Sequence, residues 1–145
     1  MNALIDTNVV LDVLQNREPW AEDGKKLFLF AASGAFTGYL AATEISDLHY
    51  LIRKQFSGLP DAGSRARDVV SRLLSLFACM DTLGEDCRNA LAIQNGDYED
   101  AILIAGARRS RMDAIVTRNA RHFAGSAVPV YSPGEFVRML EGPNE

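Results

Sequence analysis

The chain opens with residues 1–14, MNALIDTNVVLDVL, where a short apolar run changes into a helical pattern at a single acidic residue. Ala3–Ile5 are all apolar, as expected of a strand that is buried on both faces of a sheet, and apolar residues recur at helical spacing from Val9 onward. Asp6 therefore lies at the carboxyl end of a predicted strand, just before a helix. An acid in this place is either the N-cap of that helix or a ligand for a metal ion.

Strands and helices alternate along the rest of the chain. Further strands are predicted at 35–39 (AFTGY), 76–82 (LFACMDT), 113–117 (DAIVT) and 128–132 (VPVYS). Helices are predicted at 20–33, 44–56, 64–77, 100–110 and 132–140. This α/β order predicts one domain over residues 1–145, with a mostly parallel sheet covered by helices on both faces. In such sheets, functional sites lie beyond the carboxyl ends of the strands.

The composition is that of a soluble globular protein, with 48% hydrophobic and 23% charged residues. A net charge of −4 argues against a protein that coats nucleic acid by bulk electrostatics. A local basic segment is nevertheless present and is either a patch that steers a nucleic acid or a solvated helix end. Its five arginines are Arg108, Arg109, Arg111, Arg118 and Arg121.

The cellular setting is expected to be the cytoplasm. Cys79 and Cys87 have no companion His or Cys at metal-ligand spacing, which favours thiols in a reducing compartment. No apolar run approaches the ~20 residues that a membrane span needs, so we expect no membrane partner.

Acidic residues recur at the predicted strand ends and helix starts. Glu44 follows the second strand and heads an apolar helical stripe, while Asp97 and Asp100 open the helix that precedes the strand at 113–117. Thr117 and Asn119 end that strand. Each residue has a structural explanation as a helix cap, an ion-pair partner or a turn residue.

Taken together, these residues favour a metal site. Carboxylates gathered at one edge of a sheet repel each other and raise each other's pKa unless a cation neutralises them. Oxygen ligands of this kind suit Mg²⁺ or Mn²⁺, and such a site supports in-line displacement at a phosphate. The pattern therefore predicts hydrolysis of phosphodiester bonds.

Four stretches together resemble PIN-domain ribonucleases, in particular the VapC-type toxins of bacterial toxin–antitoxin modules: LIDTN (4–8), TEI (43–45), DYEDAILIAGA (97–107) and IVTRNARHF (115–123). The resemblance implies a three-layer α/β/α sandwich with a five-stranded, mostly parallel sheet. It also implies an endoribonuclease that depends on Mg²⁺ or Mn²⁺, an antitoxin partner and a homodimer.

The resemblance also implies roles for particular residues. Asp6, Glu44 and Asp100 match the family's acids, and Asp97 matches an additional acid in one branch. Asn8, Thr117 and Asn119 are expected to support the pocket. Many relatives carry a fourth acid where this chain has Asn119 or His122, so one or two metal ions remain possible. Independently of the resemblance, the basic segment suggests that Arg118 and Arg121 contact RNA.

Two alternatives to a toxin remain open at this stage. One is a housekeeping PIN nuclease that processes RNA, and the other is a non-catalytic PIN module that binds RNA or protein.

Overall fold

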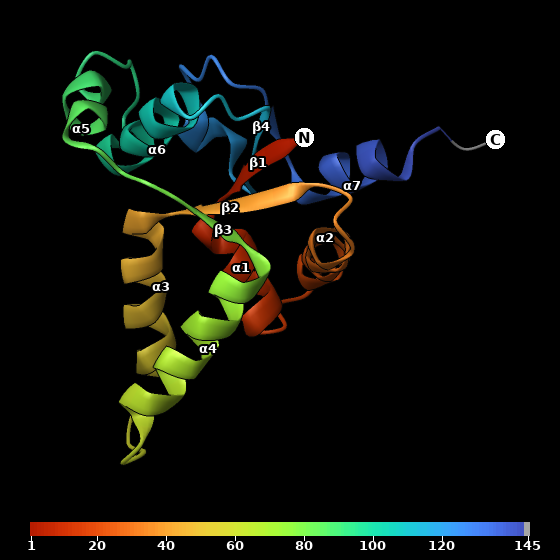
Figure 1. Ribbon diagram of the computed structural model, residues 1–145, viewed down its shortest axis with the longest axis vertical. Helices are drawn as coiled ribbons and strands as arrows, with labels where there is room; N and C mark the ends of the chain where they lie inside the picture. Colours follow the sequence, from red (N-terminus) through yellow and green to blue (C-terminus); the bar gives the residue numbers. More distant parts are fainter. Residues whose placement is uncertain (144–145) are drawn as a thin grey trace.

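Five parallel strands form the central layer of the protein (Figure 1), in the order β3-β2-β1-β4-β5. The structure, a computed structural model, describes residues 1–143. The strands are β1 (Asn2–Ile5), β2 (Thr37–Ala41), β3 (Ala78–Met80), β4 (Ala114–Val116) and β5 (Val130–Tyr131). Each neighbouring pair runs parallel. The predicted α/β fold with a five-stranded parallel sheet is confirmed.

Helices connect the strands, as parallel pairing requires. Within residues 1–143 they are α1 (Thr7–Leu14), α2 (Ala21–Ser33), α3 (Ala42–Gln55), α4 (Ala62–Leu76), α5 (Gly84–Ala90), α6 (Tyr98–Arg109) and α7 (Pro133–Glu141), with a 3₁₀ turn η1 (Ala120–Phe123). α3 begins two residues before the predicted start. α6 begins directly after Asp97, which is its N-cap, so Asp97 and Asp100 open this helix as the sequence predicts.

The two faces of the sheet bury different sets of helices. On β1, Ala3 and Ile5 point into a core shared with α1, α2, α3, α4 and α7, whereas Leu4 points into a second core with α6 and η1. This alternation follows from the two-residue period of a strand. α5 packs on α6, and Figure 1 shows this pair on the opposite side of the sheet from α3 and α4.

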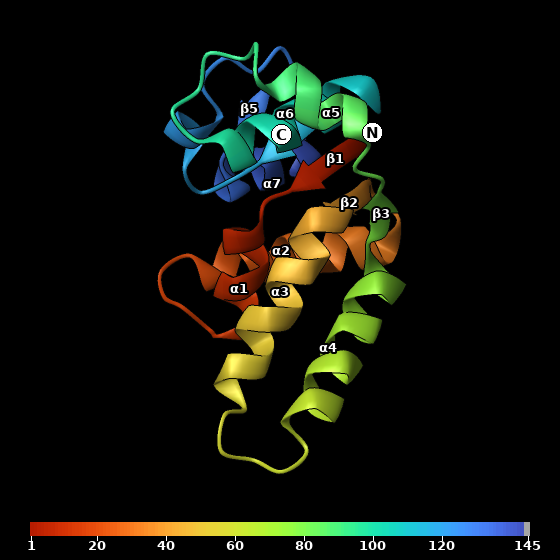
Figure 2. The same cartoon turned by 90° about the vertical axis from the view of Figure 1, so that its left-hand side faces the viewer.

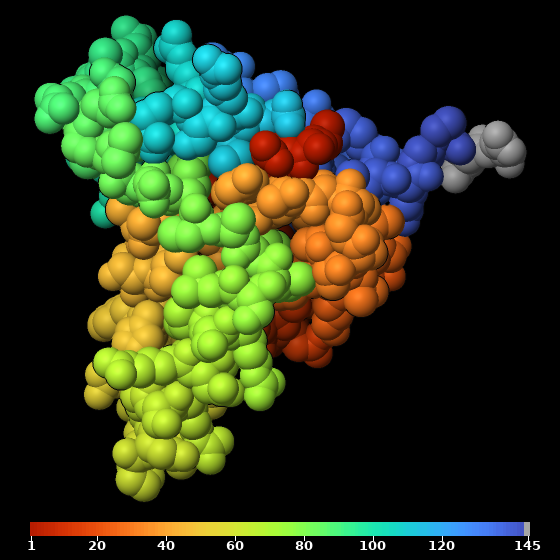
Figure 3. Space-filling model, in the orientation of Figure 1, coloured from red at the N-terminus to blue at the C-terminus, as the bar shows by residue number. Residues whose placement is uncertain are grey.

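α3 and α4 form an antiparallel pair that extends away from the sheet (Figure 2). The turn between them is the far tip of the molecule in the space-filling view (Figure 3). The first turn of α3 remains at the sheet, because the helix begins directly after β2.

The sheet brings distant residues together at its carboxyl edge. β1 and β4 are neighbours, and the backbone N–H of Asp6, just past β1, donates to the carbonyl of Val116 at the end of β4 (2.9 Å). Asp6 and Thr117 therefore leave the sheet side by side. None of the helices in the described part of the chain has the length and apolar character needed to cross a membrane.

Candidate active site

Asp6 is both a helix cap and a member of a network that spans two strands. It is the N-cap of α1, and its Oδ1 accepts a hydrogen bond from the backbone N–H of Thr7 (2.8 Å). Its Oδ2 accepts a hydrogen bond from the hydroxyl of Thr117 (2.7 Å), which is fully buried at the end of β4. The orientation of the carboxylate is thus fixed from both sides.

Glu44 is a buried carboxylate in the first turn of α3, with only 2% of its surface exposed. It accepts hydrogen bonds from the backbone N–H of Ala41 (3.0 Å) and from the hydroxyl of Thr7 (3.1 Å). Thr7 therefore links the two acids, since its N–H contacts Asp6 and its hydroxyl contacts Glu44. The short connection between β2 and α3 places Glu44 beside the end of β1.

The acids at the start of α6 take different positions. Asp97 is exposed, and its Oδ1 accepts a hydrogen bond from the backbone N–H of Asp100 (3.2 Å), as an N-cap does. Asp100 lies one turn further on, with 17% of its side chain exposed. The Nδ1 atom of His122, from η1, lies 3.8 Å from Asp100 Oδ2.

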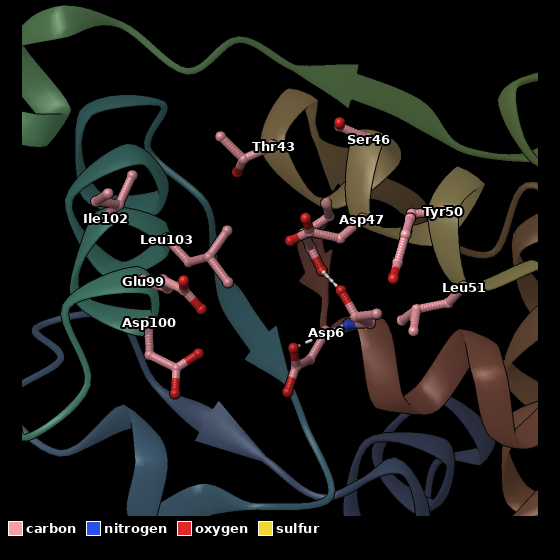
Figure 4. Close-up of a pocket in the computed structure, with 12 residues that line it drawn as sticks. Asp6, Thr43, Ser46, Asp47, Tyr50, Leu51, Glu99, Asp100, Ile102 and Leu103 are labelled. Carbon is pink, nitrogen blue, oxygen red and sulfur yellow. Dashed lines mark hydrogen bonds between the residues drawn. The ribbon is translucent and has the colours of Figure 1, made fainter. Parts of the chain in front are cut away.

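Asp6, Glu44 and Asp100 line one cavity of about 650 Å³, which Figure 4 shows between α3 and α6. Asp97 is not among the residues that line it. Two further acids do line it and were not singled out in the sequence, Asp47 and Glu99. The remaining lining residues are Thr7, Thr43, Ser46, Tyr50, Leu51, Ile102 and Leu103.

The two unpredicted acids had a signal in the sequence. Asp47 is three residues after Glu44 on the same helix, so the two share a face. Glu99 directly precedes Asp100 in the same acidic helix start.

Burial and mutual repulsion disfavour the ionised forms of these acids. Burial raises the pKa of Asp6, although the hydrogen bond from Thr117 opposes this effect. Burial and the nearby charge of Asp6 raise the pKa of Glu44 well above its ordinary value. Burial, Asp97 and Asp6 raise the pKa of Asp100 to about 6. The cavity therefore concentrates negative charge that a bound cation would neutralise.

The donor set fits a hard divalent cation. The charged side chains that line the cavity are all carboxylates, and hydroxyls stand beside them. Within residues 1–143, no three His, Cys, Asp or Glu side chains lie close enough together to hold one ion between them. Mg²⁺ usually binds proteins through one or two carboxylates and keeps several waters, so widely spaced acids around an open cavity suit it.

The predicted supporting residues Asn8, Thr117 and Asn119 form hydrogen bonds near Asp6, between the start of α1 and the segment after β4. The hydroxyl of Thr117 accepts a hydrogen bond from the backbone N–H of Asn119 (3.0 Å) while it donates to Asp6. The side-chain oxygen of Asn8 accepts from the backbone N–H of Arg118 (3.4 Å). These contacts fix the segment after β4 against the start of α1.

The basic segment does not form one free patch. Arg118 is ion-paired with Asp12 (2.8 Å) and lies over the ring of Trp20, with its guanidinium carbon 4.1 Å from the ring centroid. Arg109 is ion-paired with the buried Asp86 (2.8 Å). Arg121 is exposed on η1, next to His122.

Comparison with protein families finds one family model, described as PIN domain, that matches residues 2–121. A search of curated protein sequences finds no match.

Solved structures similar to this chain include toxins and toxin–antitoxin complexes. FitAcB from Neisseria gonorrhoeae has a TM-score of 0.71 at 18% identity, covering 91% of this chain and 98% of that one. DNA-bound VapBC from Salmonella typhimurium has a TM-score of 0.67 at 20% identity, covering 92% and 98%. VapC20 from Mycobacterium tuberculosis, a sarcin–ricin loop cleaving toxin, has a TM-score of 0.57 at 13% identity, covering 78% and 86%. At these identities the likeness shows a shared fold.

Proposed function

Because the chain belongs to the PIN-domain family, we propose that it is a divalent-metal-dependent endoribonuclease and the toxin of a toxin–antitoxin pair. The observation that carries this proposal is the cavity in which Asp6, Glu44 and Asp100 meet from three different elements. Members of the family are typically metal-dependent nucleases.

The carboxylates of Asp6, Glu44 and Asp100 would surround Mg²⁺ or Mn²⁺, with one or two of them bound to the ion directly and the rest held through its waters, and Asp97 would be a further acid at the start of α6. Such an ion, when bound, activates water and stabilises the charge that develops on a phosphate during displacement. The chain's own residues orient the acids. Thr117 and Thr7 each donate a hydroxyl hydrogen bond to a carboxylate, which favours the ionised form that a metal requires.

An antitoxin partner is proposed on the similarity to toxins solved in such complexes, among them a toxin–antitoxin complex from Klebsiella pneumoniae. We propose that the antitoxin binds near the cavity and blocks it, and that the toxin itself is a homodimer. RNA is the proposed substrate, in keeping with the sarcin–ricin loop cleaving toxin that shares the fold.

The test is cleavage of a mixed RNA pool by the purified protein in Mg²⁺, in Mn²⁺ and in EDTA. We expect cleavage in either metal and none in EDTA. Asp100→Asn should reduce the rate more than about a hundredfold, since it removes a charged metal ligand. Asp68→Asn, on the exposed face of α4, is the matched control and should cleave normally.

Cleavage at full rate in EDTA would refute the metal dependence. Absence of cleavage in every metal would instead favour a PIN module that binds without catalysis.

A further inference from the structure

Tyr50 is an exposed aromatic residue in the wall of the acidic cavity. It lies on α3, six residues after Glu44, and 63% of its surface is accessible. At 1.5 Å per residue this places it about 9 Å along the helix from Glu44. Figure 4 shows its ring alongside α3 with the hydroxyl end directed toward the cavity.

An apolar side chain and a lysine lie close to Tyr50. Leu51 lies beside it, and Ile102 and Leu103 on α6 form the facing wall of the cavity. The ammonium nitrogen of Lys54, one helical turn beyond, lies 5.7 Å from the centre of the Tyr50 ring. The wall around Tyr50 thus combines an exposed aromatic ring, the apolar Leu51 and a nearby lysine, with the carboxylate of Asp47 three residues earlier on the same helix.

An exposed aromatic ring with a lysine beside it suits an unpaired nucleotide. A neutral base would stack on an exposed aromatic ring, while a phosphate of the same nucleotide would be attracted by a nearby lysine. A second phosphate among the carboxylates would be repelled. A base is available for stacking only where it is unpaired, because both faces of a base in a duplex are already covered.

We propose that Tyr50 is a stacking platform for an unpaired base adjoining the scissile phosphate, with Lys54 contacting that nucleotide's phosphate. The inference rests on the proposed ribonuclease function and deepens it, because it names the residues that would hold an unpaired base beside the acids. The position of Lys54 favours RNA over a protein partner here, since it would repel the arginine side chains that commonly stack on tyrosine.

The experiment measures binding separately from cleavage. The probes are a hairpin RNA with a randomised unpaired loop and a fully paired duplex, and Kd is measured by fluorescence anisotropy in Ca²⁺, which takes the same oxygen ligands. Tyr50→Phe keeps the ring, and Tyr50→Leu keeps only apolar bulk. Leu29→Ala, at an exposed apolar position on α2, is the matched control.

We expect Tyr50→Phe and Leu29→Ala to bind the loop RNA like the wild type, and Tyr50→Leu to bind it about tenfold more weakly. Binding of the duplex should be the same for all four proteins. Loop binding by Tyr50→Leu within twofold of the wild type would overturn the proposal and assign the exposed ring to a protein contact.

A parallel cleavage assay in Mg²⁺ tests the proposed ribonuclease activity separately from the proposed base subsite at Tyr50. Loop binding that depends on the ring without any cleavage would refute the ribonuclease and leave the base subsite standing. Cleavage with no effect of Tyr50→Leu on loop binding would refute only the subsite.

Discussion

The guanidinium of Arg118 forms two hydrogen bonds, of 2.8 and 3.2 Å, with the carboxylate of Asp12, which is only 2% exposed. Asp12 belongs to α1, the helix that Asp6 caps, and Arg118 directly follows Thr117. The pair therefore fastens the segment that carries Thr117 to the helix that begins at Asp6. Arg118 retains 24% exposure of its side chain, so the two partners are unequally buried.

Because Asp12 is more deeply buried than Arg118, removing Arg118 should cost more unfolding free energy than removing the charge of Asp12. Within residues 1–143, Arg118→Met leaves the buried Asp12 carboxylate with one remaining ion-pair partner, Arg17, 3.7 Å away, and should lower the free energy of unfolding by about 3 kcal/mol. Asp12→Asn leaves an arginine that can still reach water and should cost roughly 1–2 kcal/mol. Urea denaturation of both variants checks the order. A larger loss of unfolding free energy in Asp12→Asn than in Arg118→Met would mean that Asp12 is not buried in solution.

Salt dependence tests Arg121, an exposed arginine of the basic segment that we expect to contact RNA. Arg121→Gln should reduce the slope of log Kd against log salt for single-stranded RNA by about 0.7, the value for one phosphate contact. The exposed Arg67→Gln, on α4, is the control and should leave the slope unchanged. Equal slopes for both variants and the wild type would mean that Arg121 is a solvated surface residue that does not contact RNA.

Asparagine variants separate helix caps from metal ligands. Asp100→Asn removes a charge that Asp97 and Asp6 repel, so in EDTA at pH 8 it should melt at or above the wild-type temperature while losing cleavage. Asp6→Asn should also lose cleavage, although Asn remains a good N-cap.

Asp97→Asn is expected to lose less activity than either, because its carboxylate caps α6 outside the cavity lining. Melting curves and cleavage rates of the three variants provide the measurement. A fully active Asp6→Asn would mean that Asp6 is only a cap.

Acid stability depends on the pair of Asp86 and Arg109. Burial alone would raise the pKa of Asp86, but hydrogen bonds from Arg109 and from the N–H of Leu83 outweigh it and hold that pKa below the ordinary value. A lowered pKa means that the unfolded chain binds the proton more readily. The stabilisation is therefore complete above the unfolded pKa and is lost as the pH falls through the folded one.

Asp86→Asn should lower the free energy of unfolding at pH 7 and show a smaller further loss than the wild type between pH 5 and pH 3. Urea denaturation across that range checks this difference. The exposed Asp68→Asn should track the wild type at each pH. A parallel loss in Asp86→Asn and the wild type would contradict the lowered pKa.

The sequence predicted the fold because the strands are apolar runs and because α2, α3 and α4 are amphipathic over three turns or more. It missed α5, whose seven residues, GEDCRNA, carry little apolar pattern. That helix is held by Asp86, which accepts from the N–H of Leu83 at its start and pairs with Arg109 of α6. Such contacts depend on tertiary structure.

The ion pair of Arg118 also depends on tertiary structure and could not be predicted from the sequence. A charge is visible in the sequence, but its partner lies 106 residues away. The overlooked signal was Asp12 itself, an acid set among the apolar residues of VVLDVL, where a buried carboxylate requires a partner.

The central place of β1 also affects how the protein is made. β1 is synthesised first, yet its two neighbours, β2 and β4, end 36 and 111 residues later, at Ala41 and Val116. On the ribosome, Asp6 and Glu44 emerge early, but the hydroxyl that orients Asp6 arrives only with Thr117. Non-local pairing of this kind delays folding until most of the chain is available. A nascent or prematurely released chain that ends before β4 would therefore carry the acids without Thr117 and without the strand that pairs with β1, so Asp6 would not be held in its place in the cavity.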